Sequence, residues 1–338
     1  MFQLGRLKGE ANAGRAMPFQ TKRGFRQRLL GIPLGEASFG RRGFRQSNAK
    51  AVSHLEKVGR KFLEGYNAAL AVDDVSEVVS TLNATRDEFR GFAYEGAAMA
   101  LKLLDSLTPW RRPRLQHFLA NEGAAHVYMV HVGAGWALAR LPRLRRKIER
   151  RLVMFDPLLR PLVVDGLAFS AAFFNPRVYV RAGKRPKHLT GYWLRAFDQG
   201  VGRSLWFVEG AEVAAIASTI ATFEQTRQRD LWSGVGLACT YAGGVSAEEI
   251  QFLKAFAGPH LPHLAQGATF AAKARQRASI VGAHTELACN LLCGMSAADA
   301  ALLADDALKN LPHDPRAPAY EIWRRRIQAQ YSREVEFA

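Results

Sequence analysis

Five charged side chains stand inside segments that are otherwise small and apolar: Glu95 in FAYEGAAMA, Asp165 in LVVDGLAF, Asp198 and Arg203 in FDQGVGRSLWF, and Asp230 in RDLWSG. A charge buried in an apolar interior is costly unless it is paired, so each needs a partner or a shifted pKa. We expect Arg203 to pair with one of the carboxylates. Such sets occur in catalytic centres and also in structural ion pairs between helices. These five residues are the candidate catalytic set.

Three aromatic side chains accompany these charges. Trp206 and Phe207 follow Arg203 on the same segment, and Trp232 follows Asp230. Large aromatic residues next to a charge serve either as core anchors or as the wall of an apolar pocket. We expect these three to line an interhelical cavity that binds a hydrophobic small molecule.

One acidic motif could hold a metal ion. Asp73, Asp74 and Glu77 form DDxxE, which places carboxylates three and four residues apart on one side of an expected helix. The motif resembles the aspartate motif of terpene synthases, in which carboxylates bind magnesium that bridges to a diphosphate. No second metal motif follows it, and acidic faces with this spacing are common. Magnesium is expected only if this terpene-cyclase-like alternative holds, and the sequence indicates no other cofactor.

Composition excludes several classes of protein. Of the 338 residues, 48% are hydrophobic and 23% are charged, which is typical of a folded chain rather than a disordered one. The three cysteines, Cys239, Cys289 and Cys293, are too few for a disulfide framework and lie in apolar segments. Reduced thiols favour the cytoplasm, and Arg6, Lys8 and other charges interrupt any apolar signal region at the start. We therefore expect a cytoplasmic protein, with association to a membrane surface left open.

The spacing of apolar residues predicts helices almost throughout the chain. Apolar residues recur every three and four positions from Leu55 onward, and only 177–181, reading RVYVR, resembles a strand. The fold class is therefore mostly α, with little or no sheet. Gly202 and Gly236 begin similar segments 34 residues apart, and Gly166 lies 36 residues before the first. This spacing indicates either stacked helical repeats or a compact helical bundle, forming a single domain over 49–338 with repeat-like halves.

Two tight turns between helices are also predicted. A glycine is followed two residues later by a serine at Gly244–Ser246 and at Gly294–Ser296. Glycine favours the end of a helix and serine favours the start of the next one.

Residues 1–48 differ from the rest of the chain. The first 50 residues contain 11 basic and 2 acidic side chains, more than half of the net charge of +17. We expect 1–48 to be an irregular basic arm that docks on an anionic membrane surface or a partner protein, because apolar residues interleave with its arginines. Nucleic acid is not an expected partner, since the chain has no zinc-finger, RRM or helix-turn-helix pattern.

Several longer phrases are similar to those of a known family. They are FGRRGF (39–44), RGFAYEGAAMA (90–100), HVGAGWALARL (131–141), FDQGVGRSLWFVEGA (197–211) and DLWSGVGLACTYAGG (230–244). From about Ser38 to about Trp323, the chain resembles a bacterial domain family of unknown function encoded beside the polyketide synthases of enediyne biosynthetic clusters. The resemblance implies an accessory protein of specialised metabolism that works with a polyene or polyketide chain. It supplies no set of catalytic residues.

Two functions of different kinds therefore stand as hypotheses. The first is a protein that binds, or acts as an enzyme on, a hydrophobic polyene-like chain in a cavity between helices. The second is a non-catalytic scaffold of helical repeats that docks a partner or a membrane through the basic arm.

Overall fold

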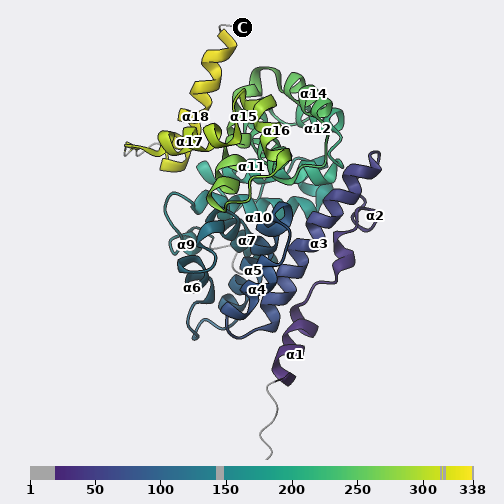
Figure 1. Cartoon of the computed structure of the whole chain (residues 1–338), viewed down its shortest axis with the longest axis vertical. Helices are drawn as coiled ribbons and strands as arrows, with labels where there is room; N and C mark the ends of the chain where they lie inside the picture. The colour runs from purple at the N-terminus through teal and green to yellow at the C-terminus, as the bar shows by residue number, and fades with distance from the viewer. Residues whose placement is uncertain (1–19, 142–147, 313, 315–316, 337–338) are drawn as a thin grey trace, which may run out of the picture.

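The described chain consists of helices. The computed structural model describes residues 20–141, 148–312, 314 and 317–336. Over these ranges there is no β-strand, and an isolated bridge joins Asp314 to Ala317. Figure 1 shows helix α1 at one end of the molecule and helix α18 at the other. The prediction of a mostly α fold is confirmed.

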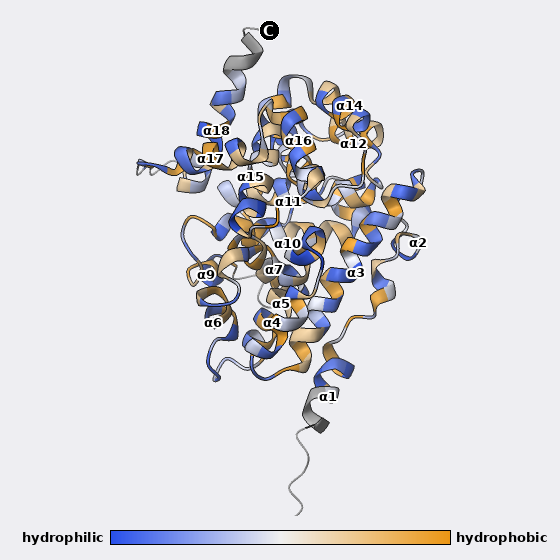
Figure 2. Cartoon of the chain, viewed as in Figure 1, coloured by the Kyte–Doolittle hydropathy of each residue, from blue (hydrophilic) through white to orange (hydrophobic). Residues whose placement is uncertain are grey.

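The centre of the fold is a series of long helices that pack on one another in chain order. They are α3 (Ala49–Ala71), α5 (Asp87–Leu107), α7 (Val127–Arg140), α10 (Arg160–Phe174), α11 (Tyr192–Val208), α13 (Gln225–Ala242) and α15 (Leu261–Arg277). Each long helix between α3 and α15 therefore packs on the one before it and on the one after it. Blue and orange residues alternate along α3 in Figure 2, as expected of a helix with one buried face.

Shorter elements connect the long helices or flank the series. The connecting elements are α4 (Ser76–Asn83), α6 (Arg114–Ala120), η2 (Ala124–His126), α9 (Ile148–Leu152), η3 (Arg177–Arg181), α12 (Val213–Ala221), α14 (Ala247–Ala257) and η4 (Gly258–His260). The flanking elements are α1 (Gln20–Leu30), η1 (Leu34–Ala37) and α2 (Phe39–Arg42) before α3, and α16 (Ala283–Cys293), α17 (Ala297–Leu308) and α18 (Ala319–Glu336) after α15. A single long helix and its short connector account for the spacing of about 34 residues in the sequence.

Glycines allow the long helices to approach each other closely. A Cβ atom on Gly202 of α11 would lie 2.1 Å from the carbonyl oxygen of Leu231 on α13, and one on Gly234 would lie 2.0 Å from that of Gln199. Gly236 has the same relation to Leu264 on α15. These glycines therefore let α11, α13 and α15 pack closely on one another.

Replacing Gly202 by alanine should therefore destabilise the protein. The added methyl group meets backbone, which cannot move aside as a flexible side chain would, so we expect a loss of about 2 to 3 kcal/mol in the free energy of unfolding. Gly24→Ala on α1 is the matched control, because a Cβ there meets no atom within 4 Å. Denaturant unfolding of both variants measures the difference, and equal stability would contradict this packing.

The predicted turns are confirmed, but one local prediction is wrong. Ser246 caps α14 in a capping box, Ser296 caps α17, and Gly294 ends α16 in the left-handed conformation. The predicted strand at Arg177–Arg181 is instead a π-helix, because the chain turns after Pro176 and of its residues Val180 alone is buried.

The described part of the expected irregular arm, from residue 20, is largely helical. It contains α1, η1 and α2, separated by the turn around Gly31 and Pro33 and by Ser38. Residues 1–19 lie outside the described chain. None of the described helices alone has the length and hydropathy of a membrane span, although α16 and α17 meet these criteria as a pair bent by 65°.

Candidate functional site

An apolar pocket lies among the long helices. It holds about 730 Å³ of empty space, counting space open to solvent. Side chains from α3, α5, α7, α10, α11 and α13 line it, and η1 completes the wall. Its aromatic lining residues are Phe62, Phe92, Trp136, Phe169, Phe173, Phe174, Phe207 and Tyr241. A pocket of this kind suits a hydrophobic ligand.

Glu95 is an acidic side chain in this apolar lining, and it is only 3% exposed. Trp136 Nε1 donates a hydrogen bond of 2.9 Å to Glu95 Oε1. Burial raises the pKa of Glu95 from 4.5 to about 7, although the charge of Arg203 and the Trp136 bond act in the opposite direction. The carboxyl group can therefore both donate and accept a proton near neutral pH.

Arg203 is the basic residue of α11 in the same lining. Its guanidinium forms an ion pair with Asp165 on α10 and lies 5.2 Å from the centroid of the Phe169 ring. Gln199 Nε2 donates a hydrogen bond of 2.8 Å to the other oxygen of Asp165. Burial acts to lower the pKa of Arg203, but Asp165 and Glu95 raise it, so the residue stays charged. The expected pairing of Arg203 with a carboxylate is confirmed.

Tyr241 adds a polar group that the sequence analysis missed. Its hydroxyl is buried without a hydrogen-bond partner among the described residues. A Cβ atom on Gly91 would lie 1.9 Å from this oxygen, so glycine is needed there to make room for it. Burial raises the pKa of Tyr241, so the hydroxyl keeps its proton at neutral pH.

The recurrence of glycine-rich phrases in the sequence is a signal by which Trp136 and Tyr241 could have been found. Both lie in glycine-rich phrases like the one around Arg203, at VGAGWAL and ACTYAGG. Comparison of these phrases could have placed them on successive helices of the series.

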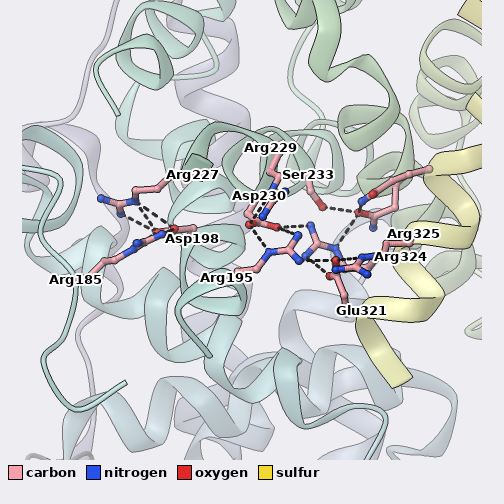
Figure 3. A network of polar contacts seen from close by, with 12 residues as sticks. Arg185, Arg195, Asp198, Arg227, Arg229, Asp230, Ser233, Glu321, Arg324 and Arg325 are labelled. Carbon is pink, nitrogen blue, oxygen red and sulfur yellow. Dashed lines mark hydrogen bonds and ion pairs between the residues drawn. The ribbon is translucent and has the colours of Figure 1, made fainter. Parts of the chain in front are cut away.

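Asp198 lies in a separate ion-pair cluster outside the pocket lining (Figure 3). Arg227 binds its carboxylate, with 2.7 Å between Nη2 and Oδ1, and Arg185 forms a second ion pair with it. Arg227 also donates to the carbonyl of Gly183, in the connection between η3 and α11. The cluster therefore fixes this connection to α11 and α13.

Asp230 belongs to a second cluster that fixes the C-terminal helix (Figure 3). Arg195 donates two hydrogen bonds of 3.0 Å to its carboxylate, and Arg324 Nη2 of α18 lies 2.8 Å from Oδ1. Burial acts to raise the pKa of Asp230, but Arg324 and Arg195 outweigh it and hold the pKa below its usual value. Glu321 pairs with the same two arginines. These contacts join α11, α13 and α18.

Of the three predicted lining aromatics, Phe207 lines the pocket, whereas Trp206 and Trp232 do not. Arg203 and Phe207 are four residues apart and share a face of α11, while Trp206 is rotated about 100° from Phe207. Trp206 Nε1 instead donates a 2.9 Å hydrogen bond to the carbonyl of Gly243. Trp232 is buried at 3% exposure outside the lining.

The acidic motif spans the turn between α3 and α4 rather than one helical face. Asp73 and Asp74 precede the helix, which begins at Ser76 and contains Glu77. Asp73 pairs with Arg26 at 2.6 Å, and Asp74 accepts a hydrogen bond from the Ser76 backbone. Within the described ranges, no group of three or more His, Cys, Asp or Glu side chains could hold a metal ion.

Comparison with known proteins gives a family but no characterised relative. No curated protein and no solved structure matched the chain. Residues 21–331 match a family described as "Protein of unknown function (DUF1702)". This match covers nearly the whole series of helices and both ion-pair clusters, and the chain therefore belongs to the DUF1702 family.

Proposed function

We propose that this protein binds a hydrophobic chain in the apolar pocket and acts on it through Glu95 and Arg203. The observation that carries the proposal is that a buried acid with a pKa of about 7 and a buried guanidinium lie together in a lining that is apolar except for Glu36 and Tyr241. A binding pocket with a few convergent polar groups and a perturbed pKa is the usual form of such a site.

The two groups have complementary roles. Glu95 transfers a proton to or from the bound chain, and the bond from Trp136 fixes the orientation of its carboxyl group. Arg203, held by Asp165, stabilises negative charge that develops on the ligand. The aromatic walls exclude water and stack against a conjugated chain. Together these features support proton-transfer chemistry on a polyene-like substrate.

The proposed setting is bacterial specialised metabolism. We propose that the chain is a polyene or polyketide intermediate of an enediyne-type pathway, in which this protein is an accessory factor. The support is the resemblance of phrases such as RGFAYEGAAMA and FDQGVGRSLWFVEGA to the family described above, together with an aromatic pocket of suitable chemistry.

Titration with 1,6-diphenylhexatriene tests the pocket, because this neutral polyene fluoresces strongly in apolar surroundings. The wild-type protein should bind it saturably. Ala238→Trp fills the pocket from α13 and should weaken binding about tenfold or more. Phe252→Ala, at an exposed position on α14 outside the lining, is the control and should leave binding unchanged. Equal binding by all three proteins, with unchanged circular dichroism, would contradict the proposal.

Docking through the basic N-terminal residues remains a separate prediction. The structure gives some of these arginines partners within the chain: Arg26 pairs with Asp73, and Arg45 with Glu209. Deleting residues 1–19, which leaves these pairs in place, should reduce binding to anionic liposomes at low salt if this segment docks on membranes. Unchanged liposome binding would contradict that role.

A further inference from the structure

A second, polar cleft adjoins the apolar pocket. It holds about 1210 Å³ of empty space, counting space open to solvent, and lies among α3, α13, α15 and the start of α16. Tyr241 and Ala242 line both the cleft and the apolar pocket. The two spaces therefore share a wall at the C-terminal end of α13.

Arg275 gives the cleft a buried positive charge. The residue is 4% exposed, and within the described chain it forms no ion pair with a carboxylate. Its terminal nitrogens donate to the backbone carbonyls of Asp87, Glu88 and Tyr241, and its guanidinium carbon lies 4.0 Å from the centroid of the Tyr241 ring. Its Nε has no partner among the described residues. Carbonyl oxygens carry only partial charges, so the cation is incompletely neutralised.

The start of helix α16 supplies a second feature that favours an anion. Gly282 precedes this helix and provides no side-chain cap. Gly282 and the residues of the first turn, Ala283, His284 and Thr285, all line the cleft. The first backbone N–H groups of a helix lack partners within it and carry partial positive charge, so they attract anions.

Other cleft side chains fit the same ligand. The hydroxyl of Thr240 is buried without a partner in the described part of the chain, and Lys50 is exposed at the cleft. The carboxylates present are already engaged: Glu249 accepts from the backbone of Ser246 and from Asn48, and Glu88 pairs with Arg86 at 3.2 Å. Among the described residues, the Nε of Arg275 and the hydroxyl of Thr240 are therefore buried polar groups of the cleft that have no partner.

We propose that this cleft binds a phosphate monoester that forms the head of the ligand whose chain occupies the apolar pocket. A tetrahedral phosphate has enough acceptor oxygens to meet Arg275, the α16 N-terminus and the Thr240 hydroxyl together. The substrate class is then an amphipathic molecule with an apolar chain and an anionic head. This inference rests on the proposed function, because it assigns the chain to the pocket described above.

Calorimetric titration with inorganic phosphate, dodecanol and dodecyl phosphate separates the two spaces. Inorganic phosphate alone should bind the cleft, dodecanol the apolar pocket, and dodecyl phosphate should bind at least about tenfold more tightly than dodecanol. Lys50→Glu should weaken the binding of both phosphates about tenfold and leave dodecanol unaffected. Lys57→Glu, at another exposed position on α3 that lies outside the cleft, is the matched control.

Thr240→Val provides a variant that should keep its fold, since it removes a hydroxyl that has no partner among the described residues. It should also weaken phosphate binding. If dodecyl phosphate binds no more tightly than dodecanol, or if neither Lys50→Glu nor Thr240→Val affects phosphate, the inference is overturned while the proposed function stands. If dodecanol fails to bind, the proposed function itself is contradicted, and with it the assignment of a single ligand to both spaces.

Discussion

Replacing Glu95 by glutamine should remove a pH dependence from the stability of the protein. Glu95 has an ordinary pKa of 4.5, and its burial raises this to about 7 in the folded state. Between these values the unfolded chain has lost the proton while the folded protein keeps it, so the free energy of unfolding falls as pH rises. A difference of about 2.5 pH units corresponds to about 3 kcal/mol. This contribution is fully present below pH 4.5 and is lost as the pH rises through 7.

The measurement is denaturant unfolding of the wild type and Glu95→Gln across pH 4.5 to 8. Subtracting the free energy of unfolding of the variant from that of the wild type cancels the titration of all other groups. This difference in free energy should fall by about 3 kcal/mol over the pH range. Infrared spectroscopy should show a protonated carboxyl band that disappears near pH 7 and is absent from the variant. A difference that stays constant with pH would mean that Glu95 titrates as an ordinary exposed acid.

Glu95→Gln should also separate binding from chemistry. Glutamine keeps the shape of the side chain and can still accept the bond from Trp136, so diphenylhexatriene should bind about as tightly as to the wild type. A strain that lacks the gene for this protein and is complemented with Glu95→Gln should form about 100-fold less pathway product, or even less, than one complemented with the wild type. The reason is that glutamine cannot transfer the proton. Full product formation by this variant would exclude Glu95 as the acid or base.

Removing the Asp230 carboxylate should cause the largest loss of stability. Asp230→Ala leaves Arg324, whose side chain is fully buried, without its closest carboxylate, which lies at 2.8 Å. Glu321 remains at 3.4 Å but also serves Arg195 and Arg325. Breaking a buried ion pair from one side typically costs about 3 to 5 kcal/mol, and we expect a value in this range.

Asp306→Ala on α17 is the matched control for this prediction. Asp306 forms an exposed ion pair with Lys309, and such pairs contribute at most about 1 kcal/mol. Thermal and denaturant unfolding should therefore show a much larger loss in the free energy of unfolding for Asp230→Ala than for Asp306→Ala. A small loss for Asp230→Ala would show that the cluster does not hold α18 against α11 and α13.

The candidate site could be predicted only in part from the sequence. The small apolar residues around Arg203 were sufficient to predict that it is buried and paired, because a buried charge is costly without a partner. They could not select the partner, since Asp165, Asp198 and Asp230 all stand in similar segments. The packing of segments more than 30 residues apart in the chain decides which helices face each other. This packing places Asp165, and not Asp198 or Asp230, beside Arg203.

The fold was more predictable than the pocket for the same reason. Apolar spacing, the serines at helix starts and the recurring glycines are local signals, and they predicted helices, their repeat-like spacing and the turns between them. The strand predicted for 177–181 failed because alternation over five residues also arises in a short turn of helix. Trp136 and Tyr241 were missed because neither is charged, and their importance depends on neighbours that come from other helices.

A crystal structure of the protein with 1,6-diphenylhexatriene would show whether the apolar pocket binds a polyene next to Glu95. We expect ordered ligand density between Phe62 and Phe207, in van der Waals contact with the aromatic walls and reaching the Glu95 carboxyl group. Density confined to the outer surface, with the pocket filled by rearranged side chains, would contradict it.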